Sequence, residues 1–228
     1  MILSDLYKLA VILPKKKKID KMQEIDKTEK SSLRKKADEI KELRCKNLIA
    51  VLEEPTDIKN IGTVVRNINA LGVEKLYIVD SQKRLPDDWQ EMRESKSLLK
   101  PSVSAIKWTF VKTFNSTEEC IEHLKNNKFT SVVTSPHIKG KYNVILQEGN
   151  YIQKRLAVWF GNESQGISDL AVENSEACLS IEMCGIIESF NLATSTGIVL
   201  YEITKQRREY QKNNKRAIKR DPKIKSEE

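Results

Sequence analysis

The chain has 228 residues, of which 39% are hydrophobic and 32% charged, and a formal net charge of +8. This length allows one sizeable core with extensions, and no apolar run approaches the length that crosses a membrane. Four scattered cysteines and two histidines argue against a zinc site and a disulfide framework. The apolar N-terminal stretch precedes its lysines, the reverse of a secretory signal, so we expect a soluble cytoplasmic protein without a metal.

The basic charge is concentrated at the two ends of the chain. Residues 1–47, 48–204 and 205–228 carry net charges of +6, −4 and +6. We therefore predict a basic N-terminal helical arm, a central domain and a basic C-terminal helical extension with a tail. Lysine clusters such as Lys15 to Lys18 suit a nucleic-acid backbone, although lysine-rich arms are also common as solvated helix surface.

Strands alternate with helices along the central domain. Apolar runs predict strands at 47–54, 75–80, 105–114, 129–136, 156–162 and 177–183. Helical spacing and capping residues predict helices from Asn60 to Leu71, after Ser116, near Ser168 and from about Ser189 into the basic tail. This alternation predicts an α/β fold with a mostly parallel sheet covered by helices on both faces.

Ligands bind such sheets at the carboxyl ends of the strands, so the loops there are the candidate sites. Three stretches that follow strands carry polar residues or glycines: Asn60 to Arg66, Gly161 to Gly166, and Ile181 to Asn191. Taken singly, each has a plain structural interpretation. Arg66 could form a surface ion pair, the glycines could serve a tight turn, and Ser189 or Asn191 could cap a helix. Familiar dinucleotide and P-loop glycine motifs are missing from the sequence.

Together, and in this order, the three stretches resemble the SpoU family of RNA ribose 2′-O-methyltransferases, within the SPOUT superfamily. The first motif pairs Asn60 with Arg66 in NIGTVVR, and the second is G-x-E-x-x-G, starting at Gly161 with Glu163. The third motif leads from the last strand into a helix start that contains Ser189 and Asn191. The resemblance covers roughly residues 48–208.

The resemblance implies a C-terminal deep trefoil knot, a homodimer and S-adenosylmethionine as the cofactor. In this family the cofactor lies in the knot and is held largely by backbone groups of the loops. By motif position, the cofactor-binding residues are expected to be Thr134, Gly161, Ile181 and Phe190.

The same resemblance assigns the catalytic roles. Methylation of a ribose 2′-hydroxyl needs removal of its proton, and neither histidine lies in a motif. The family role of base falls to Arg66, activated by the RNA phosphate. Because arginine keeps its proton in proteins, Arg66 could instead bind the phosphate and the ribose oxygen electrostatically. We expect Asn60 to orient Arg66 or the substrate, Glu163 to position its loop, and Ser189 and Asn191 to brace the knot and Arg66.

Two positions depart from the family pattern, and one segment does not align with it. Glu182 replaces the usual proline after the isoleucine of the last strand, and Phe190 replaces a commoner leucine. Both changes lie near the expected adenine pocket. The charged segment from Ser81 to Pro101 has no clear counterpart in the family.

The substrate is expected to be RNA. Basic arms on both sides of one catalytic domain look most like the TrmH group, which methylates a D-loop guanosine of tRNA. We therefore predict binding of tRNA, largely through its shape and phosphates. Two alternatives remain: a ribosomal RNA ribose methyltransferase, and an RNA-binding protein that keeps the knot without catalysis.

Overall fold

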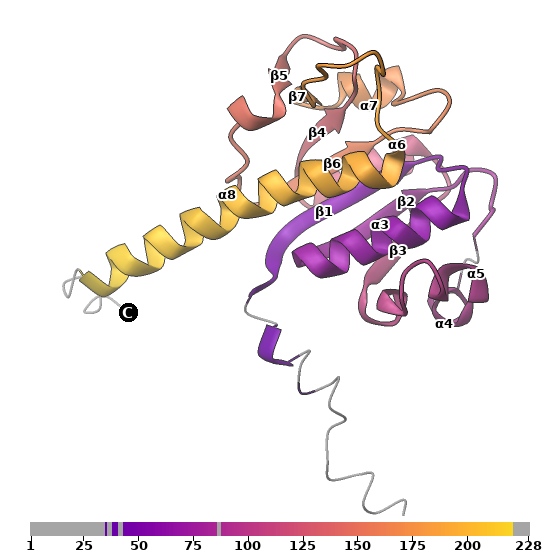
Figure 1. Ribbon diagram of the computed structural model, residues 1–228, viewed down its shortest axis with the longest axis horizontal. Helices are drawn as coiled ribbons and strands as arrows, with labels where there is room; N and C mark the ends of the chain where they lie inside the picture. The colour runs from indigo at the N-terminus through magenta and orange to yellow at the C-terminus, as the bar shows by residue number, and fades with distance from the viewer. Residues whose placement is uncertain (1–34, 36–37, 41–42, 86–87, 221–228) are drawn as a thin grey trace, which may run out of the picture. The chain divides into compact units, whose positions relative to one another are not determined.

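The computed structural model describes residues 35, 38–40, 43–85 and 88–220, so most of the predicted N-terminal arm and the last eight residues lie outside it. Residues 44–220 build one sheet covered by helices (Figure 1). The strands are β1 (Cys45–Glu53), β2 (Val73–Val79), β3 (Phe110–Phe114), β4 (Thr130–Thr134), β5 (Asn143–Ile145), β6 (Leu156–Phe160) and β7 (Ala177–Ser180). The helices are α3 (Ile58–Leu71), α4 (Trp89–Glu94), α5 (Lys96–Leu99), α6 (Thr117–Asn126), α7 (Asp169–Glu173) and α8 (Leu192–Arg220).

The seven strands lie in the order β3-β2-β1-β6-β4-β7-β5, and all six neighbouring pairs are parallel. This confirms the predicted mostly parallel sheet. Because the strands run in the same direction, the loops after β1, β4, β6 and β7 emerge at one edge of the sheet.

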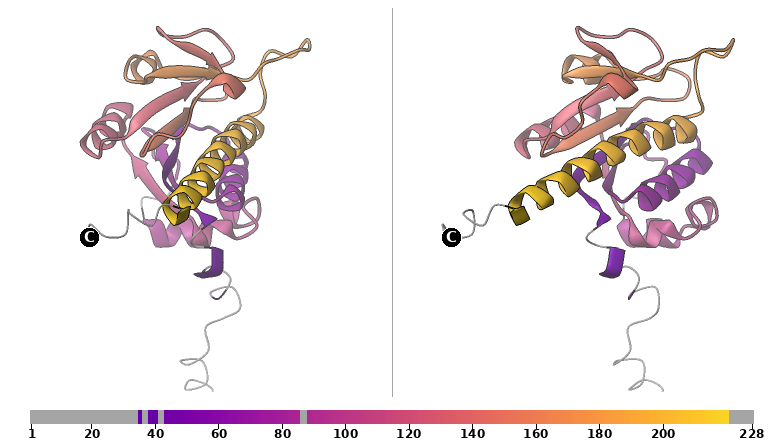
Figure 2. Two further views of the ribbon diagram at one scale, coloured as in Figure 1. Left: turned by 90° about the vertical axis from the view of Figure 1, so that its left-hand side faces the viewer. Right: turned by 60° about the vertical axis from the view of Figure 1, so that its left-hand side comes forward.

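Helices cover both faces of the sheet (Figure 2). Side chains of a strand alternate between its faces, and β1 is buried on both. Leu48, Ala50 and Leu52 belong to the apolar cluster that includes residues of α3 and α8. Ile49 and Val51 belong to a second cluster, with residues of α6 and α7. The central strand therefore separates two hydrophobic layers.

Several predicted helix ends are confirmed. Gly72 ends α3 with a left-handed φ of 74°, a conformation that glycine adopts without steric cost. The side chains of Ser116 and Ser168 accept hydrogen bonds from backbone N–H groups in the first turns of α6 and α7. Local sequence is sufficient for these ends because the capping groups lie within three residues of their partners.

Other predicted boundaries were wrong. Helix α3 begins at Ile58 because Asp57, not Asn60, caps it by accepting from the N–H of Lys59. Residues 105–108 form a 3-10 helix, η2 (Ala105–Trp108), and the hydroxyl of Thr109 donates to the carbonyl of Ala105. Strand β3 therefore starts only at Phe110.

The strand β5 was not predicted from the sequence. It is followed directly by a 3-10 helix, η3 (Leu146–Glu148). Helix α8 begins at Leu192, three residues after Ser189.

The segment from Ser81 to Pro101 contains α4 and α5 and packs beside α3. A Cβ atom at Gly62 of α3 would lie 2.3 Å from Cγ of Pro101, so this close approach requires glycine.

Helix α8 continues from Leu192 to Arg220 and thus crosses the domain boundary predicted at 204/205. Two arginines hold this helix on the domain. Buried Arg207 donates to the carbonyls of Tyr151 and Gln153, and Arg208 donates to the carbonyl of Leu71. Within the described residues, no helix has the length and apolar character needed to cross a membrane.

Candidate functional site

A cavity of about 470 Å³ opens at the carboxyl ends of β4, β6 and β7 and is closed by the start of α8. Its volume is in the range of small-molecule sites. The four positions expected to bind the cofactor all line it: Thr134, Gly161, Ile181 and Phe190. Three of the five predicted catalytic residues also line it: Glu163, Ser189 and Asn191.

The loop from Gly161 to Ile167 folds back on itself. The backbones of Asn162 and Gly166 exchange two hydrogen bonds, and the side-chain oxygen of Asn162 accepts from the N–H groups of Ser164 and Gln165. A Cβ atom on Gly161 would lie 2.2 Å from backbone atoms of Gly166 and Ile167. Gly161 is therefore required by the turn itself.

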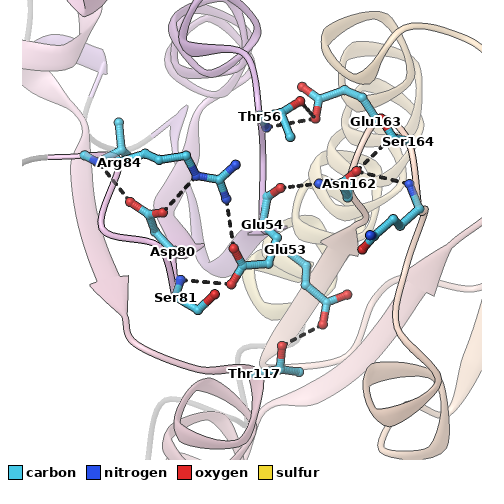
Figure 3. Close-up of polar contacts among 12 residues, drawn as sticks. Glu53, Glu54, Thr56, Asp80, Ser81, Arg84, Thr117, Asn162, Glu163 and Ser164 are labelled. Atoms are coloured by element: carbon cyan, nitrogen blue, oxygen red, sulfur yellow. Dashed lines mark hydrogen bonds and ion pairs between the residues drawn. The ribbon is translucent and has the colours of Figure 1, made fainter.

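The carboxylate of Glu163 joins this loop to the loop after β1 (Figure 3). It accepts hydrogen bonds from the backbone N–H and the hydroxyl of Thr56 at 2.9 and 2.8 Å. It also accepts from Nδ2 of Asn60 at 3.0 Å and from the N–H of Asp57 at 3.4 Å. An anion here also faces the positive end of the α3 dipole.

These contacts keep Glu163 ionised. Partial burial of the carboxyl group would raise its pKa, but the hydrogen bonds from Asn60 and Thr56 outweigh burial. The pKa of Glu163 is lowered from its ordinary value of 4.5 to about 2. Glu163 is therefore an acceptor at neutral pH, and a role in positioning the loop suits it better than a role as general acid.

A directed chain of hydrogen bonds continues from Glu163 to α8. Asn60 donates to Glu163, and Nδ2 of Asn191 donates to Oδ1 of Asn60 at 3.1 Å. Oδ1 of Asn191 accepts from the N–H of Ala193 at 2.9 Å and so caps α8. Both ends fix the orientation of the amides, because a carboxylate only accepts and a backbone N–H only donates. The first turn of α3, the loop after β6 and the residue before α8 are thereby joined, although they are far apart in sequence.

The other two predicted catalytic residues stand apart from this chain. Ser189 lines the cavity and is exposed, and it makes no hydrogen bond with another described residue. Arg66 is exposed on α3, outside the cavity lining, and likewise has no polar partner among the described residues. Arg66 follows Asn60 by six residues of the helix. The two side chains therefore differ in direction by about 120° around the helix axis and are about 9 Å apart along it. The structure therefore does not bring Arg66 and Asn60 together.

Two adjacent glutamates at the end of β1 bond to the segments that surround the site (Figure 3). Glu53 is buried and accepts from the hydroxyls of Thr117 and Ser168, at the starts of α6 and α7. Glu54 points the other way and pairs with Arg84 at 2.8 Å. The carbonyl of Glu54 accepts from Nδ2 of Asn162, which ties the end of β1 to the glycine-rich loop.

Sequence reasoning missed four of these supporting residues: Glu53, Glu54, Thr56 and Asn162. The one local signal was at Asn162, since an asparagine in a tight turn often bonds the backbone two residues on. The partners of Glu53 and Thr56 lie 64 to 115 residues away, so no local pattern indicates them.

The remaining wall comes from the loop between β7 and α8. Within the described part of the chain, residues 182–190 make no hydrogen bond, and eight of these nine residues are exposed. Ile181, Met183 and Phe190 line the cavity. The departure at Glu182 is exposed and outside the lining, whereas the departure at Phe190 contributes to the wall.

Comparison with known proteins gives a consistent result. A family model described as the SpoU rRNA Methylase family matches residues 47–201. The chain is 30% identical over 171 residues to the tRNA (guanosine(18)-2′-O)-methyltransferase of Aquifex aeolicus, covering 75% of each chain. It is 29% identical over 154 residues to the 23S rRNA (adenosine(1067)-2′-O)-methyltransferase of Streptomyces azureus, covering 68% of this chain and 53% of that one.

Among solved structures, the A. aeolicus TrmH/SpoU tRNA modifying enzyme is similar with a TM-score of 0.65 and 27% identity. The match covers 78% of this chain and 86% of that chain. The family match thus extends over nearly all of the sheet, the cavity lining and the first part of α8.

Proposed function

The chain belongs to the SpoU methylase family, and we propose that it transfers a methyl group from S-adenosylmethionine to a ribose 2′-hydroxyl of RNA. The observation that carries this proposal is the hydrogen-bond chain from Glu163 through Asn60 to Asn191. It joins the three motif segments beside one cavity of suitable size, and Glu163 and Asn191 line that cavity.

The cavity fits S-adenosylmethionine in chemistry as well as in volume. Phe160, Ile181 and Phe190 offer apolar walls for an adenine ring. The backbone groups of residues 182–190 have no partner among the described residues, so a ligand can bond them. When bound, the cofactor supplies a methyl group carried on a positively charged sulfur.

The residues of this chain then have separate tasks. Glu163, Asn60 and Asn191 hold the three loops in register, so that a reactive group bound in the cavity has a fixed direction. We propose that Arg66, which is exposed and has no polar partner among the described residues, binds a phosphate and the ribose oxygen of an incoming RNA. Deprotonation of the hydroxyl is assisted by that phosphate or by water, because arginine keeps its proton.

We propose a guanosine of tRNA, in the D-loop, as the target. The matched relative from A. aeolicus is named for guanosine 18 of tRNA, and the match covers 75% of its length. The S. azureus relative is named for ribosomal RNA and has nearly the same identity, but only 53% of its length is covered. Ribosomal RNA is therefore the second candidate.

Assembly is also part of the proposal. Exposed apolar side chains gather on α8 and on the loop before it: Ile186, Ile187, Phe190, Ile198 and Tyr201. An apolar surface of this kind favours a homodimer.

We further propose the family's trefoil knot for the C-terminal segment, RNA contact for the basic arms of residues 1–47 and 205–228, and a cytoplasmic location.

The proposed function is tested with the full chain and radiolabelled S-adenosylmethionine. Unmodified tRNA and ribosomal RNA are incubated separately, then digested to nucleosides, and the labelled nucleoside is identified. We expect label in 2′-O-methylguanosine from tRNA. Arg66→Ala should lower transfer by about 100-fold or more, with cofactor affinity and melting temperature unchanged. Arg66→Lys asks whether the bidentate guanidinium is needed.

The outcomes separate the parts of the proposal. Label in ribosomal RNA only would keep the reaction and change the substrate. Cofactor binding without transfer to either RNA would contradict the reaction. Full activity of Arg66→Ala would remove Arg66 from the mechanism.

A further inference from the structure

A second hollow, of about 470 Å³, lies at the opposite edge of the sheet from the cofactor cavity. It is formed by the end of α6 and by the residues just before β4 and β6. Its charged lining residues are all cations: Lys128, Lys154 and Arg155. The amides of Asn126, Asn127 and Gln153 supply further polar groups.

Arg155 is held in place by its neighbours. Its Nη1 donates to the carbonyl of Asn127 at 2.6 Å, and its guanidinium carbon lies 6.0 Å from the centre of the Phe129 ring. These contacts fix the plane of a group with five N–H donors, of which Asn127 uses one. A guanidinium fixed in this way is suited to bind an oxyanion such as a phosphate.

Lys128 occupies a backbone conformation that disfavours a lysine. It follows the cap of α6 with a left-handed φ of 56°, where glycine or asparagine is most favourable. The positive charges of the hollow are not required to compensate unpaired carbonyls at the end of α6. Carbonyls of the last turn already accept from the backbone N–H groups of residues 127–129, and Arg155 covers the carbonyl of Asn127. The ammonium group of Lys128 is therefore available to bind an anion.

The charges of the hollow also stand out from the domain around it. The segment from 48 to 204 has a net charge of −4, yet no carboxylate lines the hollow. Neither Lys128 nor Lys154 has an ion pair or hydrogen bond through its side chain with any described residue. Three cations that face one hollow without an acidic partner repel one another, and a bound anion would relieve this repulsion.

We propose that this hollow binds phosphates of the RNA backbone, as a contact separate from the basic arms and from the methyl-transfer site. The inference rests on the proposed function, because it takes the RNA substrate as the ligand. Arg155 supplies the bidentate contact, and Lys128 and Lys154 neutralise adjacent phosphates. The contact positions the RNA without reading its sequence.

The position of the hollow suits a long substrate. Arg155 and Gly161 flank β6, and the six steps between them span about 20 Å of extended chain. This distance corresponds to about six stacked nucleotides of one strand. An RNA whose target ribose is at the cavity can therefore contact the hollow with a neighbouring part of its backbone.

The test compares matched charge changes in the full chain. Lys128→Gln/Lys154→Gln removes two charges at the hollow, and Lys96→Gln/Lys100→Gln removes two exposed charges elsewhere. The dissociation constant of an unmodified tRNA transcript is measured over a range of salt concentrations. We expect the first pair to weaken binding about tenfold and to reduce the salt slope by about 1.5, and the second to change neither appreciably. Affinity for S-adenosylmethionine should remain unchanged in both.

Lys128→Gly separates charge from folding. Glycine suits the left-handed backbone, so the melting temperature should not fall, while RNA binding should weaken. If the wild type methylates tRNA but the hollow variants bind it with unchanged affinity and slope, the inference is wrong. Equal losses in both double variants would also overturn it, since net charge alone would then explain them. A wild type that neither binds nor methylates RNA would instead contradict the proposed function.

Discussion

Two loops that line the same cavity are held in opposite ways. The loop from Gly161 to Ile167 is bonded within itself and to the loop after β1, through Asn162 and Glu163. In the loop after β7, residues 182–190 make no hydrogen bond with any described residue, and Ile186 is 98% exposed. One wall of the site is thus complete without a ligand, whereas the other has unused backbone groups.

This difference indicates a division of labour. A bonded loop keeps its geometry before substrate arrives and can direct the reacting groups. A loop with unpaired backbone donors and acceptors gains hydrogen bonds when a ligand binds, so its order depends on the ligand. We therefore expect changes in the first loop to affect folding and rate, and changes in the second to affect mainly ligand affinity.

The largest expected effect is that of Gly161→Ala. The new Cβ would lie 2.2 Å from backbone atoms of Gly166 and Ile167, so the turn must open. We expect the free energy of unfolding to fall by about 2–4 kcal/mol and most of the methyl-transfer activity to be lost. Chemical denaturation and the transfer assay measure the two effects.

Gly185→Ala is the matched control in the other loop. No atom lies within 4 Å of its added Cβ, so stability should change by less than about 0.5 kcal/mol. Similar effects of the two alanine variants on stability would contradict the contrast between the loops.

An intermediate effect is expected for Glu163→Gln. The amide of glutamine keeps the shape of the carboxylate, but it replaces one acceptor oxygen with an NH₂ group. This NH₂ group must face a donor, either Thr56 or Nδ2 of Asn60. We expect a loss of about 1 kcal/mol at pH 7, limited by the exposure of the site, and a roughly tenfold lower rate. Glu182→Gln, in the unbonded loop, should have no measurable effect on stability.

The difference between wild type and Glu163→Gln should depend on pH. The pKa of Glu163 is lowered in the folded state to about 2 from 4.5, so the carboxylate adds stability that is fully present above about pH 5. This stability is lost as the pH falls from about 4.5 towards 2. Denaturation midpoints of both proteins across this range test the assignment, and a constant difference would show that ionisation of Glu163 does not contribute.

The smallest effect is expected for ligand binding itself. Adding S-adenosylmethionine should slow amide hydrogen exchange in residues 182–190, because their N–H groups acquire partners. Exchange in residues 162–166 should change little, since the N–H groups of Asn162 and Gly166 are bonded beforehand. Equal protection of both loops would indicate that the glycine-rich loop also closes around the ligand.

Local patterns in the sequence were sufficient for much of the fold. Apolar runs located six of the seven strands, and the left-handed Gly72 ended α3 as predicted. The short edge strand β5 was missed because its three residues, one exposed and two partly buried, show little periodicity. The start of α3 was misplaced because Asp57 and Asn60 are both good capping residues, and their side chains alone do not decide between them.

The motif residues could be listed from the sequence, and their positions at the carboxyl edge followed from strand direction. The pattern did not indicate that Arg66 would lie outside the chain joining Glu163, Asn60 and Asn191. That arrangement depends on the pitch of α3 and on which side of it packs against the sheet.

The sequence by itself determined the alternation of strands and helices, the basic ends and the three polar loops, because each is written in neighbouring residues. Only the tertiary structure decided which loops meet. Strand β1 pairs with β6, more than 100 residues later, and this pairing brings Glu163 to Thr56 and Asn60. The parallel pairing of β4 with β6 likewise assembled the basic hollow from Lys128, Lys154 and Arg155. Contacts of this kind arise from sheet order and register, which local periodicity does not encode.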